Sequence, residues 1–75
     1  MNNERRKKLK QVIGLLEEAS EIVDSCMDDE REALDNLPES LQSSDRGFEL
    51  EDNIDILQQA IDDIDDIVSA LEDLL

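Results

Sequence analysis

Residues 50–75 read LEDNIDILQQAIDDIDDIVSALEDLL, and their apolar side chains recur at alternating steps of three and four residues. This spacing is a heptad repeat, which is typical of a helix that packs along a partner helix. Ala60, Ile67 and Leu74 widen the repeat on one side, and the carboxylates fall off it. A disordered acidic tail would not sort its charges by face. The repeat positions are Leu50, Ile54, Leu57, Ile61, Ile64, Val68, Leu71 and Leu75.

The first half of the chain carries a similar but broader repeat, interrupted where Glu30 takes one of its positions. Its other positions are Leu9, Val12, Leu16, Ala19, Val23, Cys26, Ala33 and Leu37. More apolar residues flank it, namely Ile13, Met27 and Leu34 on one side and Leu15 and Ile22 on the other. An apolar surface this wide exceeds the strip that a single partner helix covers.

The connection between the two repeats reads DNLPESLQSSDRG, residues 35–47. Pro38 disfavours helical geometry in the residue before it and suits the first position of a new turn, so PESLQ is expected to form one short helical turn. Ser43 or Ser44 can cap the second helix. Gly47 is unfavourable inside a helix, and two explanations are open: a close approach of the two long helices, or a slightly later helix start.

These patterns predict an all-α fold, an antiparallel, coiled-coil-like helical hairpin that forms a single domain over residues 1–75. We expect a helix over about residues 3–36, a connection over about 37–44 and a helix over about 45–74. Three apolar columns on each helix leave Ile13, Leu15, Ile22, Ile56 or Ile67 partly exposed in a lone hairpin. The sequence therefore also predicts that two hairpins associate as a homodimeric four-helix bundle.

The charge of the chain is large and unevenly distributed. Its 75 residues carry 22 Asp and Glu against seven Lys and Arg, a net charge of −15. Residues 1–10 carry a net charge of +4, so the other 65 residues carry −19. Over a hairpin of about 45 Å this is about one charge per 2.4 Å, which approaches the value of about 1.7 Å for duplex DNA.

The residue types exclude most catalytic and metal chemistry. The chain has no His and a single Cys, so it lacks the ligands of a usual zinc site and cannot form an intrachain disulfide. It has no Gly-rich phosphate loop, and its Asp-rich stretches lack the Gly that an EF-hand loop requires. We therefore expect no enzyme activity, no cofactor and no specific metal site, and we expect Cys26 to be a buried core residue.

An acidic waist is predicted halfway along the hairpin, where carboxylates of the two helices come level. It has two interpretations that the sequence leaves evenly weighted: a merely solvated face, or a binding surface for a cationic partner. The second is favoured by the scarcity of Lys among the carboxylates, since surfaces built for solubility interleave both signs. The candidate partner-binding residues are Glu17, Glu18, Glu21, Asp62, Asp63, Asp65 and Asp66.

A basic cluster, Arg5, Arg6, Lys7 and Lys8, opens the chain. Neutralising the acidic end of the second helix is its favoured role, because the net charge of −15 repels nucleic acid. We expect no direct nucleic-acid binding and no membrane contact. The apolar run VIGLL is too short for a signal peptide, and with Met1 it leads us to expect a whole small cytosolic protein.

The connection and its flanks, EALDNLPESLQSSDRGFELEDNIDILQQAIDDI, resemble a group of small acidic proteins of bacteriophages and related mobile elements whose activity is unassigned. The basic start and the two acidic helices are similar as well. The resemblance implies a phage or prophage origin and carries no site residue. The matching residues are Asn36, Pro38, Glu39, Ser40, Leu41, Arg46 and Gly47.

Two functions are consistent with these features. The first is a phage-type acidic interaction protein that binds and inhibits a host protein, such as a defence enzyme or a nucleic-acid-binding protein, through a carboxylate surface that mimics DNA. The second is a structural or assembly coiled-coil protein whose acidic face is only solvated. The sequence names no target for the first function.

Overall fold

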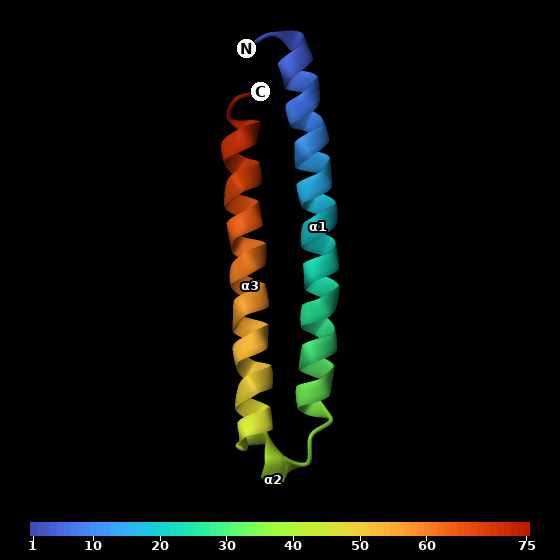
Figure 1. Cartoon of the computed structure of the whole chain (residues 1–75), viewed down its shortest axis with the longest axis vertical. Coiled ribbons are helices and arrows are strands. Elements are labelled where there is room, and N and C mark those ends of the chain that lie inside the picture. The colour runs from blue at the N-terminus through green and yellow to red at the C-terminus, as the bar shows by residue number, and fades with distance from the viewer.

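A computed structural model describes all of residues 1–75 and shows an antiparallel helical hairpin (Figure 1). Helix α1 spans Asn3–Asp35, the short helix α2 spans Glu39–Gln42, and α3 spans Asp45–Glu72. The Cα atoms extend over 59 × 15 × 11 Å. The all-α hairpin is confirmed, and the ends of its long helices lie within two residues of those expected.

Side chains at the helix ends explain where each helix begins. The Asn2 side chain caps α1 by accepting a hydrogen bond from the Arg5 backbone N–H at 2.9 Å. Ser44 caps α3 by accepting one from the Gly47 backbone N–H at 3.5 Å. Between the helices, Pro38 precedes the short turn of α2, as its fixed geometry predicts. The connection is thus an ordered turn that sets the spacing of α1 and α3.

Gly47 owes its place to the connection. It is buried in the first turn of α3, and a Cβ atom there would lie 2.0 Å from the carbonyl oxygen of Gln42 and 2.6 Å from its carbonyl carbon. Because α3 begins at Asp45, a later helix start does not explain the glycine. The close approach is to the backbone at the end of α2, rather than to α1.

The core is a seam between α1 and α3. On α3 it follows the predicted repeat, with Leu50 1 % exposed and Val68 9 % exposed. Leu75 departs from the expectation, since it lies beyond the end of α3 and is exposed.

On α1 one of the two columns of the predicted seam is displaced by one residue, so α1 is rotated about its axis relative to the expectation, whereas Leu9, Leu16, Val23 and Leu37 are half-buried as predicted. Ile13 and Met27 are buried there, whereas Val12 and Cys26, expected in the core, are exposed. The reason is that α1 carries two overlapping repeats. The one that faces α3 offers the larger side chains, which bury more apolar area. Its positions are Leu9, Ile13, Leu16, Ser20, Val23, Met27, Glu30, Leu34 and Leu37.

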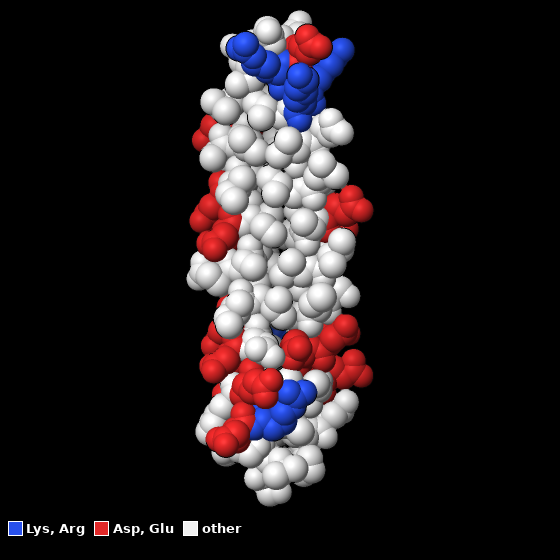
Figure 2. Space-filling view, viewed as in Figure 1, with Lys and Arg blue, Asp and Glu red and all other residues white.

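The unused repeat of α1 and the widened side of α3 remain exposed. As predicted, Leu15, Ile22, Ile56 and Ile67 are accessible, with 49 to 67 % of each residue's surface exposed. Ile13, which was expected among them, is buried. Figure 2 shows the result, a mostly uncharged surface down the middle of the hairpin with acidic side chains along its edges.

Candidate interaction surfaces

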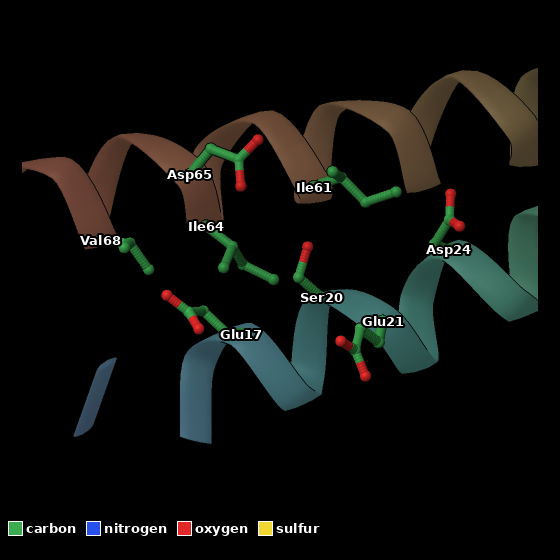
Figure 3. Close-up of a pocket in the computed structure, with 8 residues that line it drawn as sticks. All are labelled: Glu17, Ser20, Glu21, Asp24, Ile61, Ile64, Asp65 and Val68. Atoms are coloured by element: carbon green, nitrogen blue, oxygen red, sulfur yellow. The ribbon is translucent and has the colours of Figure 1, made fainter. Parts of the chain in front are cut away.

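An acidic groove runs between α1 and α3 on one side of the seam. It is a shallow hollow of about 400 Å³ with Ile61, Ile64 and Val68 among its lining residues. Figure 3 shows Ser20 between the two helices, with Glu17 and Asp24 on either side of it along α1. The other lining residues are Glu21 and Asp65. The groove therefore combines an apolar strip with four carboxylates.

The structure brings three of the seven predicted partner-binding residues to this groove: Glu17, Glu21 and Asp65. Asp24 joins them and was missed. The rotation of α1 explains the difference, because it turns Asp24 toward the groove and turns Glu18 outward. At about 100° per residue, Glu18 lies about a quarter turn or more from Glu17.

The remaining predicted residues of α3 also lie outside the groove. Asp62 accepts a hydrogen bond from Gln58 at 3.1 Å, and Asp63 accepts one from Gln59 at 2.9 Å, each along the helix's own surface. Asp66 is exposed and is not among the groove residues. The acidic waist is therefore an acidic belt with one concave part, and the uncharged strip in Figure 2 interrupts it on the other side of the hairpin.

No cationic side chain neutralises the groove. The hairpin has two ion pairs, Arg31 with Asp28 at 3.5 Å and Arg46 with Glu49 at 3.3 Å, and both are exposed pairs within one helix. Exposed pairs of this kind contribute little to stability. The four groove carboxylates thus present their full charge to the solvent and to any approaching molecule.

The basic cluster lies at the end of the hairpin that holds both termini (Figures 1 and 2). It was expected to neutralise the end of α3, but none of its side chains forms an ion pair with Glu72 or Asp73 within 4.0 Å. Arg6 donates to the Asn3 side chain at 3.4 Å. The cluster therefore keeps its charge available.

The second surface is the exposed apolar face, on the side of the seam away from the groove. Its most hollow part is about 250 Å³ and is lined by Cys26, Glu30, Asn53, Ile56 and Leu57. The thiol of Cys26 is exposed here, which corrects its expected burial. The sequence signal for this face is the second apolar repeat of α1, which includes Val12 and Cys26, two residues that the heptad pattern places in the core.

The hairpin contains neither a cluster of metal-ligating side chains nor a helix that could span a membrane. No group of three or more Asp, Glu or Cys side chains converges as metal ligands would. None of the helices combines the length and hydropathy that a membrane span requires.

Comparisons of the chain with protein-family models, with curated proteins and with solved structures give no match.

Proposed function

We propose that this chain is a phage-type acidic interaction protein that binds a basic surface on a host protein and inhibits it. The observation that supports this proposal is the groove, in which Glu17, Glu21, Asp24 and Asp65 stand around an apolar strip without an ion-pair partner. Basic surfaces that hold nucleic acid are the natural complement of such an array.

The groove suits a Lys or Arg side chain better than a small anion or an apolar ligand. The aliphatic stem of such a side chain can pack on Ile61, Ile64 and Val68 while its charged end reaches a carboxylate of the wall. Further carboxylates of the belt add a long-range field that steers a basic partner toward the hairpin. The protein would then compete with nucleic acid for the same host surface.

Capture from bacterial lysate at low and moderate salt supplies the host protein for the test. The captured protein is then titrated with the hairpin in the presence of duplex DNA. Competitive displacement, with affinity that falls steeply as salt rises, is the expected result. Simultaneous binding of hairpin and duplex, or an affinity that salt leaves unchanged, would contradict the inhibitory mechanism.

A second function, a structural or assembly protein, is favoured by the exposed apolar face. Leu15 is 58 % exposed, Ile22 60 % and Ile56 67 %, although all three are large apolar residues. Covering them with a second hairpin would complete a homodimeric four-helix bundle. Self-association through apolar side chains should persist at ionic strengths that dissociate an electrostatic complex. Light scattering at several ionic strengths therefore separates the two functions.

A further inference from the structure

The exposed apolar face covers the middle of the hairpin and is shorter than the 59 Å length of the whole molecule. It spans residues 12–26 of α1 and 56–74 of α3, which is about 21 and 27 Å of helix. Contact through this face alone is therefore smaller than a standard interface of about 800 Å² on each partner, and the charged ends of the hairpin have to add to it. The face consists of Val12, Leu15, Ala19, Ile22 and Cys26 of α1 and Ile56, Ala60, Ile67, Ala70 and Leu74 of α3, and the exposed carboxylate of Asp63 lies on the same side of α3.

Both helices contribute to one and the same face. We view each helix from its own N-terminus. The exposed repeat of α1 then lies about 90° anticlockwise of the seam, and the exposed apolar residues of α3 also lie about 90° anticlockwise of the seam. Because the helices are antiparallel, equal rotations bring the two stripes to the same side of the hairpin. Figure 2 shows this continuous uncharged strip over both helices.

The two ends of the hairpin carry opposite net charge. The end with the termini holds five Lys and Arg against Glu4, Glu72 and Asp73, a net charge of +2. The other end, residues 28–52, holds ten Asp and Glu against two Arg, a net charge of −8. A parallel pair of hairpins would place like ends together, whereas an antiparallel pair places each basic end over an acidic end.

We infer that two copies of this chain pack face to face through the apolar face in antiparallel orientation, with the basic end of each copy over the connection end of the other. The twofold axis then crosses the helices, so α1 packs against α1 of the second copy and α3 against α3. This inference rests on the homodimer proposed above and adds its face, its orientation and a role for the basic cluster.

The face is tested by adding charge to it. Ile22→Glu places a carboxylate on the apolar face, and Ser25→Glu places the same charge on an exposed position of the same helix outside it. Light scattering at micromolar concentration should give the mass of a dimer for the wild type and for Ser25→Glu, and that of a monomer for Ile22→Glu. A monomeric wild type, or a dimeric Ile22→Glu, would overturn the inferred interface.

The orientation is tested by one distance. Ser43 is exposed in the connection, so a spin label on Ser43→Cys in a Cys26→Ser background marks the connection end of each copy. In the antiparallel dimer the two labels should lie about 50 Å apart or more, which is about the length of α1. A distance of about 20 Å, about two helix diameters, would show a parallel dimer and overturn the orientation alone.

A charge variant gives an independent reading of the orientation. Arg5→Gln with Lys8→Gln lowers the net charge of the basic end from +2 to 0, and both side chains are exposed. At low salt the antiparallel dimer should dissociate several-fold more readily than the wild type, because attraction between opposite ends is lost. Tighter association would contradict it, since only a parallel dimer gains when the basic ends no longer repel.

Discussion

The carbonyl oxygen of Gln42 occupies the space that a side chain on Gly47 would need, at 2.0 Å from an ideal Cβ atom. The atoms in the way belong to the backbone, so they cannot move aside as the end of a flexible side chain could. Since this contact lies where α2 meets the start of α3, it fixes how the connection joins the two long helices.

Gly47→Ala is therefore expected to lower the free energy of unfolding by about 1–3 kcal/mol, the usual range for forced overpacking. Thermal or urea unfolding followed by circular dichroism measures it. Gly14→Ala is the matched control, because nothing lies within 4 Å of a Cβ atom at Gly14 and helix propensity alone should stabilise by about 0.5–1 kcal/mol. If Gly47→Ala instead raised the free energy of unfolding as much as Gly14→Ala does, Gln42 would not constrain Gly47.

The choice of seam on α1 gives a second prediction. Met27 is 3 % exposed and Val12 40 %, so Met27→Ala should lower the free energy of unfolding by about 2–5 kcal/mol and Val12→Ala by much less. Chemical unfolding in an Ile22→Glu background, in which the proposed dimer should not form, separates the seam from the apolar face. A larger loss for Val12→Ala than for Met27→Ala would restore the seam expected from the sequence.

The thiol of Cys26 reports whether the apolar face is covered. In a lone hairpin it is exposed and should react readily with a thiol reagent. Its modification rate should fall as protein concentration rises into the range of the dimer, because the second copy shields it. A Cys26→Ser, Ser25→Cys variant moves the thiol by one residue to an exposed position outside the face, and its rate should not depend on concentration.

Salt should stabilise the hairpin. A net charge of −15 with two exposed ion pairs means that repulsion outweighs attraction, and added salt screens it. The melting temperature at constant pH should rise between about 0.02 and 0.5 M NaCl, with Debye lengths of about 20 and 4 Å. A variant that neutralises the four groove carboxylates should show a smaller rise. A melting temperature that falls with salt would mean that the charges are paired favourably.

The sequence predicts α3 better than α1 for a physical reason. On α3 one apolar repeat stands out, and from Leu50 to Val68 the seam follows it. On α1 two repeats overlap with an offset of one residue, as the neighbours Cys26 and Met27 illustrate, and periodicity alone cannot choose between them. The choice depends on which set packs better against α3, and that is a property of the pair of helices.

The same ambiguity limits what the sequence predicts about the groove. Glu17 and Asp65 were expected to face a partner, and they line the concave part of the belt. Asp24 lines the groove without having been a candidate, and the candidate Glu18 lies outside it, because the orientation of a side chain around α1 follows the seam. A displacement of one seam column by one residue thus leaves the fold unchanged but alters which carboxylates line the groove.

Capture of the host protein is proposed to depend on the groove and not on charge in general. Two variants of equal net charge, each with four substitutions, are titrated into the captured host protein, and their affinities are compared. One changes the groove by Glu17→Gln, Glu21→Gln, Asp24→Asn and Asp65→Asn, and the other changes exposed carboxylates outside it by Glu18→Gln, Glu32→Gln, Asp55→Asn and Asp66→Asn. The groove variant should lose binding, while the outer variant should keep most of its affinity. Equal affinities of the two variants would contradict this proposal.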